Sequence, residues 1–185
     1  LFETPFVYRD GLVALRKQGW IITSVVIDGK RGVAQVFEHA EIPVQYCQFH
    51  QVKTVTKYLT RKPETLAGQE LRSIMLTLPR TNEKEFTKLL NEWHQRWKDF
   101  INEKTKVLGT KHWYYTHKKV RSAYKSLETN LPFLFTYQKY PKLNIPNTTN
   151  TIDGYFASVK KKVAQHHGLR KDRRYKVISE LLNKS

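Results

Sequence analysis

Two aspartates occupy positions where a carboxylate could bind a catalytic metal ion. Asp28 follows the apolar run of residues 20–27 and precedes Gly29, and in open α/β sheets ligands bind just past the carboxyl ends of strands. Asp153 follows Asn150 by three residues, in the expected first turn of a helix. Hard cations such as Mg²⁺ and Mn²⁺ prefer oxygen ligands, and Mg²⁺ usually keeps waters for an incoming phosphate. The two carboxylates therefore predict a two-metal site for phosphodiester cleavage.

Each aspartate also has a purely structural interpretation, which the sequence leaves open. Asp28 and Gly29 together are a common turn pair. Asp153 could serve the N-terminal amides and the dipole of its own helix, as the acidic residue of a capping box does.

Cys47 and His50 form a Cys-x-x-His pair of soft-metal ligands. A structural zinc site needs four ligands, and no second pair at finger spacing exists in the sequence. Cys47 would then be a buried apolar residue with His50 hydrogen-bonded nearby. A Cys/His nucleophile pair would need an orienting third group, which the sequence does not identify.

A basic segment follows Asp153 and is interrupted by a single acidic residue, Asp172. On a helix and the segment after it, these cations could line a phosphate backbone without reading sequence. The alternative is a solvated face that only adds solubility. The predicted DNA-contacting residues are Lys160, Lys161, Lys162, Arg170, Lys171, Arg173, Arg174 and Lys176.

Composition favours a globular protein with a polyanionic partner. The 185 residues carry 33 lysines and arginines against 16 acidic residues, a net charge of +17, as expected for a surface that neutralises phosphates. A 39% hydrophobic and 12% aromatic content suffices for a packed core. A single cysteine excludes an intrachain disulfide and favours a reducing compartment. The apolar run at 20–27 is too short for a bilayer, so we expect a soluble chain without a membrane partner.

The first 50 residues alternate between helix and strand patterns. We predict a helix over 10–18, a strand over 20–27 buried on both faces, a helix over 33–37 and a strand over 43–47. This order indicates an α/β layer.

Residues 51 to about 140 are predicted to be entirely helical. The clearest helix follows Thr81 and Asn82 as capping residues, and its apolar positions recur at steps of three and four. This spacing makes the stripe a core face rather than a platform for stacking bases. The stripe consists of Phe86, Leu89, Leu90, Trp93, Trp97, Phe100 and Ile101.

A connector rich in proline and asparagine, residues 141–147, leads to a last helix that we expect to begin with Asn150 as its N-cap. Beneath the basic face of that helix runs one apolar stripe. Its members are Ile152, Phe156, Val159 and Val163.

The order of these motifs resembles the Mutator-related bacterial insertion-sequence transposases, a branch of the ribonuclease H-like DDE enzymes. The resemblance covers nearly the whole chain. It rests on Gly19-Trp20 before a strand that ends in Asp28-Gly29, on the segment from Pro43 to His50, on the helix with Trp93 and Trp97, and on the segment from Asn147 to Gly154.

The resemblance implies an α/β fold, a partial ribonuclease H-like core with a large all-α insertion. Residues 1–50 would be the first part of that core, residues 51–147 the helical insertion, and residues 148–185 the catalytic helix and basic C-terminal segment. The first catalytic aspartate of the family would lie before Leu1, so we expect an amino-terminally truncated core that does not cut DNA by itself.

The resemblance also assigns roles to residues. Asp28 matches the second catalytic aspartate, and Asp153 stands at the third acidic position, where the family usually has Glu. Cys47 and His50 match a Cys-x-x-His motif that supports the site or positions DNA, and Asn150 belongs to the segment before the third acid.

The implied activity is metal-dependent DNA strand cleavage and strand transfer at transposon ends, with two Mg²⁺ or Mn²⁺ ions and no small-molecule cofactor. The implied partners are DNA and other copies of the chain, in the bacterial cytoplasm at the nucleoid. The alternative is a non-catalytic, basic nucleic-acid-binding protein, a decayed transposase remnant.

Overall fold

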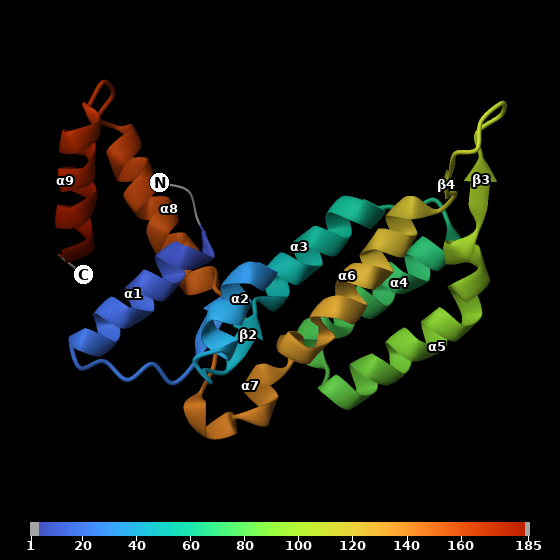
Figure 1. The fold of residues 1–185 in the computed structure, drawn as a ribbon, viewed down its shortest axis with the longest axis horizontal. Coiled ribbons are helices and arrows are strands. Elements are labelled where there is room, and N and C mark those ends of the chain that lie inside the picture. The colour runs from blue at the N-terminus through green and yellow to red at the C-terminus, as the bar shows by residue number, and fades with distance from the viewer. Residues whose placement is uncertain (1–3, 184–185) are drawn as a thin grey trace. The chain divides into compact units, whose positions relative to one another are not determined.

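The computed structural model describes residues 4–183 and is mixed α/β, mostly helical. The chain divides into two compact units, Leu1–Thr148 and Thr149–Ser185 (Figure 1). No helix within residues 4–183 combines the length and apolarity needed to cross a membrane.

A β-α-β unit opens the larger unit. Strand β1 (Val25–Ile27) pairs in parallel with β2 (Val44–Tyr46), with Val25 opposite Val44 and Ile27 opposite Tyr46. Parallel neighbours need a long crossover, and helix α2 (Arg31–Glu38) provides it while burying Val33, Ala34 and Phe37. The predicted helix over 33–37 and strand over 43–47 are confirmed at these positions.

The amino-terminal predictions need two corrections. Helix α1 spans Pro5–Lys17, earlier than the predicted 10–18, because Pro5 has the fixed φ suited to a first helical turn. The predicted strand over 20–27 shrinks to its last three residues, which are the ones that face a partner strand. Trp20 and Ile21 are 62% and 86% exposed, so this run is not buried on both faces.

Four long helices form the rest of the larger unit. They are α3 (Gln48–Leu59), α4 (Leu66–Thr77), α5 (Glu83–Asn102) and α6 (Lys118–Leu134), with the short turns η1 (Leu78–Arg80), α7 (Thr136–Lys139) and η2 (Pro141–Leu143) between and after them. Helix α6 contacts α3, α5 and also β2. One hydrophobic core therefore runs from the strands into the helices.

Helix α5 confirms its predicted start and its core face. The Asn82 side chain accepts a hydrogen bond from the Glu85 amide at 2.9 Å, which is an N-cap. Phe86, Leu90 and Trp93 are buried, and the Trp93 indole N–H donates to the Ala67 carbonyl at 3.0 Å. The aromatic stripe thus packs mainly inward, although Leu89 is exposed.

A β-hairpin contradicts the prediction that residues 51 to about 140 are entirely helical. Strand β3 (Lys104–Lys106) pairs antiparallel with β4 (Trp113–Tyr115), and Gly109 adopts φ +75° in the loop between them. Three-residue strands are too short to show a period of two, so the sequence pattern hides them.

The smaller unit is a pair of helices, α8 (Asn150–Ala164) and α9 (Lys171–Asn183). The Tyr155 hydroxyl donates to the Leu181 carbonyl at 3.2 Å, so the start of α8 lies beside the end of α9. Asn150 is the first helical residue and not the expected N-cap; Thr149 holds that position without a side-chain cap. Val159 and Val163 are buried, but Ile152 and Phe156 are largely exposed, so only half of the predicted stripe is core.

Two leucines in α4 test the assignment of the core. Leu71 is fully buried, whereas Leu76 is 46% exposed. We expect Leu71→Ala to lower the free energy of unfolding by about 3 kcal/mol, because it leaves a cavity, and Leu76→Ala to change it by less than about 1 kcal/mol. Urea unfolding followed by circular dichroism measures both; equal losses would mean that α4 packs on a different face.

Candidate functional site

The carboxyl ends of β1 and β2 meet at one edge of the parallel pair. Asp28 and Gly29 follow β1, and Cys47 follows β2. The Cys47 amide donates to the Ile27 carbonyl at 2.7 Å, which extends the pairing by one more hydrogen bond. Asp28 is exposed and Cys47 is buried, so the edge presents a carboxylate to solvent above a closed core.

Arg31 and Tyr46 lie close to each other at this edge. Arg31, in the first turn of α2, forms a 2.8 Å ion pair with Glu38 and lies 5.1 Å above the ring of Phe133. Tyr46 stacks on the same Phe133 ring at 4.6 Å. Both side chains therefore pack on the ring of Phe133 in α6.

The Tyr46 hydroxyl is the unusual group of this edge. It is buried, and within residues 4–183 no group forms a hydrogen bond with it in good geometry. Burial raises the pKa of Tyr46; the nearby guanidinium of Arg31 opposes this rise, and the negative charges of Glu38 and Asp28 add to it. The electrostatic influence of Asp28 thus reaches the phenol.

Gly29 lets the chain turn away from β1 while staying close to Tyr46. Its φ of +88° lies in the region that favours glycine. A Cβ placed there would lie 3.5 Å from the Tyr46 ring and 3.9 Å from the Asn130 amide nitrogen, which is ordinary contact. The backbone conformation, more than crowding, requires a glycine after Asp28.

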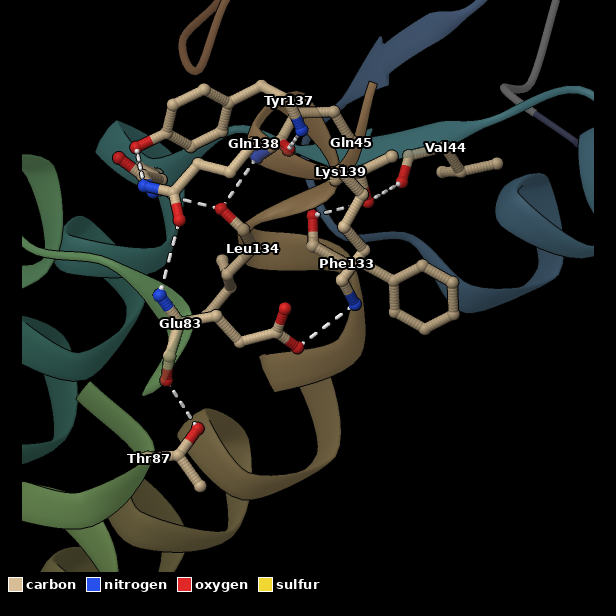
Figure 2. A network of polar contacts seen from close by, with 11 residues as sticks. Val44, Gln45, Glu83, Thr87, Phe133, Leu134, Tyr137, Gln138 and Lys139 are labelled. Carbon is tan, nitrogen blue, oxygen red and sulfur yellow. Dashed lines mark hydrogen bonds and ion pairs between the residues drawn. The ribbon is translucent and has the colours of Figure 1, made fainter. Parts of the chain in front are cut away.

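Three buried glutamines, Gln45, Gln48 and Gln51, which we call the glutamine ladder, join this edge to α6. The side-chain amide of Gln45 donates to the Leu134 carbonyl at 2.9 Å, and the Gln45 oxygen accepts from the Tyr137 amide at 3.0 Å (Figure 2). The side-chain amide of Gln48 donates to the same Leu134 carbonyl, also at 2.9 Å. Gln51 contacts α6 through Ser126 and Asn130. The ladder satisfies buried carbonyl and amide groups at the end of α6.

The connector after η2 returns to the same edge. The Gln48 amide donates to the Asn147 carbonyl at 2.9 Å, and the Asn147 side chain donates to the Gln48 side-chain oxygen at 3.1 Å. These two hydrogen bonds hold Asn147 beside Gln48, at the carboxyl end of β2.

Cys47 and His50 lie in different surroundings. Cys47 is 1% exposed, as a small apolar core residue would be, while His50 is half-buried and contacts the ring of Phe49 at 5.7 Å. No three His, Cys, Asp or Glu side chains within residues 4–183 are grouped so that they could hold a metal ion.

Asp153 lies in the smaller unit, in the first turn of α8. Its carboxylate accepts a hydrogen bond from the Thr149 hydroxyl at 2.8 Å, and its amide donates to the Thr149 carbonyl at 2.8 Å. Asp153 is exposed. The side chain thus interacts with the start of its own helix and still faces solvent.

The basic residues predicted to contact DNA gather around the turn between α8 and α9. Lys160, Lys161 and Lys162 are in the second half of α8, and Arg170 to Lys176 span the turn and the first half of α9. All eight predicted cations are exposed. This end of the helix pair therefore carries many exposed positive charges, and we call these eight residues the basic surface.

The structure brings Asp28 and Cys47 to one edge and places Asp153, Asn150 and the basic residues in the other unit. Sequence analysis missed Arg31, Tyr46 and the glutamine ladder. Tyr46 gave a weak signal, as the last residue of a strand beside a candidate site. Arg31 gave none, because its position depends on the packing of α2.

No protein-family model, curated protein or solved structure matches this chain.

The buried Tyr46 hydroxyl yields a stability prediction. Arg31 is close enough to the hydroxyl to influence its pKa, but its geometry makes no well-aligned hydrogen bond. We therefore expect Tyr46→Phe to raise the free energy of unfolding at pH 7 by about 1 kcal/mol. The folded pKa of Tyr46 lies above its unfolded value of about 10, so its protonated form contributes stability that is complete below pH 10 and lost above it. The variant should therefore lose stability less steeply above pH 10, by up to about 1.4 kcal/mol per pH unit.

Urea unfolding between pH 7 and pH 11.5 measures both effects. Tyr140→Phe, at a ring that is 46% exposed, is the matched control and should change neither. A Tyr46→Phe protein that is less stable at pH 7 would show that the hydroxyl has a partner.

Proposed function

We propose that this chain is part of a DNA transposase catalytic domain, in which Asp28 and Asp153 bind Mg²⁺ or Mn²⁺ for strand cleavage and transfer at transposon ends. In this proposal the two units carry separate parts of the machinery. The larger unit contributes Asp28 at the strand edge, and the smaller unit contributes Asp153 and the basic surface.

The observation that carries the proposal is the position of Asp28. It is an exposed carboxylate directly after the first strand of a parallel β-α-β unit. Ligands of open α/β sheets bind at this carboxyl edge, and an exposed carboxylate has the oxygen ligands that Mg²⁺ requires.

The basic surface supports a phosphate-bearing partner. Lys171, Arg173 and Arg174 lie in the first turn of α9, where the helix dipole is already positive. Backbone phosphates would neutralise both the side chains and the helix end, and such contacts are independent of base sequence.

Metal binding provides the main test. We expect Asp28→Asn and Asp153→Asn each to weaken Mn²⁺ binding by about tenfold or more, because each removes a charged oxygen ligand. Isothermal titration calorimetry and electron paramagnetic resonance on the full 185-residue chain measure this. The matched control is Asp99→Asn, an exposed aspartate of α5 far along the chain from both sites.

Duplex DNA affinity is measured in parallel across salt concentrations. Replacing Lys160, Lys161 and Lys162 by Gln should reduce the slope of log K against log salt by about 0.9 for each lost phosphate contact. Unchanged Mn²⁺ binding in both aspartate variants, together with this salt dependence, would refute the catalytic proposal and leave a DNA-binding protein.

That second candidate, a non-catalytic nucleic-acid-binding protein, is favoured by the interactions of Asp153. Its carboxylate accepts from Thr149 as a helix-terminal acid does. In that case Asp28 is the first residue of a turn completed by Gly29, and the exposed cations alone account for affinity.

A further inference from the structure

A groove lined by lysines lies at the end of α3 that is farther from Asp28. It has a volume of about 490 Å³ and is bordered by the end of α3, the loop before α4, strand β4 and the start of α6. Helix α3 begins at Gln48, beside the strand edge, and ends at this groove. Its 12 residues span about 18 Å at about 1.5 Å per residue, so the groove is distinct from the Asp28 edge.

Lysines line this groove and surround it. Lys62, Lys118 and Lys119 are exposed on its walls, where the acidic residue is Glu64. Among residues 4–183 these three lysines form no ion pair. Further cations lie on the adjoining hairpin and α6. These are Lys104, Lys106, Lys111 and Arg121. The charge of the groove is therefore complementary to a polyanion.

Exposed aromatic rings accompany the lysines. Tyr58 and Tyr114 line the groove with exposed fractions of 38% and 53%. On the hairpin, Trp113 is 49% exposed and lies under the Lys104 ammonium at 4.0 Å. Arg121 covers the Tyr115 ring, also at 4.0 Å. Tyr115 also lines the groove, but Arg121 covers its ring, whereas the Tyr114 ring is open to solvent.

The hairpin is held rigidly on the helices behind it. The His117 ring stacks on Phe100 at 3.5 Å and contacts the Glu103 carboxylate at 2.9 Å. The hydroxyls of Thr105 and Thr116 are 2.7 Å apart across the two strands. Such contacts fix the backbone that carries Tyr114, so an incoming ring would meet a preorganised surface.

We propose that this groove binds an unpaired nucleic-acid strand, with bases stacked on Tyr114 and Tyr58 and phosphates neutralised by Lys62, Lys118 and Lys119. Proteins that bind single strands combine a positive groove with aromatic side chains on which bases stack. Bases in a duplex already stack on one another, so an exposed tyrosine face is matched by an unpaired base. An acidic peptide would satisfy the lysines but would leave the rings without a stacking partner.

Binding of fluorescein-labelled oligo(dT) of 20 nucleotides, measured by fluorescence anisotropy in EDTA, tests this site. We expect Tyr114→Ala to weaken binding by about tenfold and Tyr114→Phe to retain it, because stacking needs the ring and not the hydroxyl. The effect on a 20-base-pair duplex should be smaller. Replacing Lys118 and Lys119 by Gln should reduce the salt slope by about 0.7 for each lost contact.

Matched controls separate the groove from general charge. Lys84 and Lys142 are exposed lysines near the α5 start and in η2, and their replacement by Gln removes the same charge without lowering oligo(dT) affinity as much. The Tyr114 variants are also measured with Lys160, Lys161 and Lys162 replaced by Gln, so that the basic surface of the smaller unit does not conceal the groove.

Three results would overturn the proposal: Tyr114→Ala binding oligo(dT) as the unmodified chain does in both backgrounds, equal losses for duplex and single strand, or poly-glutamate competing as well as oligo(dT). The readout is independent of the proposed catalytic site. Oligo(dT) binding in EDTA involves no metal ion, so failure of Mn²⁺ binding and failure of the groove are separate outcomes.

Discussion

The larger unit depends on the glutamine ladder, which connects the parallel strands to the helices. Gln45 reaches from β2 to both the end of α6 and the start of α7, and Gln48 joins α6 to the connector. Buried amides are stable in a core only when they are bonded, and partly satisfied networks are costly. The ladder therefore fixes one relative position of strand, helix end and connector, which an apolar core of the same volume would specify less strictly.

This constraint determines where the two candidate surfaces of the larger unit lie. The end of α6 is held at the strands, while its start and the end of α3 form the walls of the distal groove. The two candidate surfaces are thus opposite ends of shared helices within one core. The strand edge presents one exposed carboxylate, and the groove presents lysines and tyrosines.

Sequence patterns predicted elements whose own residues determine them. Helix α5 has 20 residues of regular spacing and a capping asparagine, and β2 is a compact apolar segment between helices. The predicted strand over 20–27 is longer than the observed one. Pairing of a strand depends on its partner strand, which the pattern of Trp20 and Ile21 cannot reveal. The sequence pattern does not reveal the hairpin, because each of its strands has only three residues. The position of Asp28 at the end of a strand was predictable from the sequence. The surroundings of Tyr46 and Arg31 depend on packing, which the sequence pattern does not show. The three glutamines share a surface only because a strand changes into a helix between Gln45 and Gln48.

The first turn of α9 has an unusual charge arrangement. Lys171, Arg173 and Arg174 repel one another and the positive helix end, and Asp172 offsets them only in part. Dissolved salt screens this repulsion and so favours the helix in the free protein. The same salt also removes the gain from binding phosphates. Higher ionic strength consequently stabilises the fold of this helix pair but weakens its attraction for a polyanion. The salt concentration that best orders the free helix is therefore higher than the one that would best favour a complex.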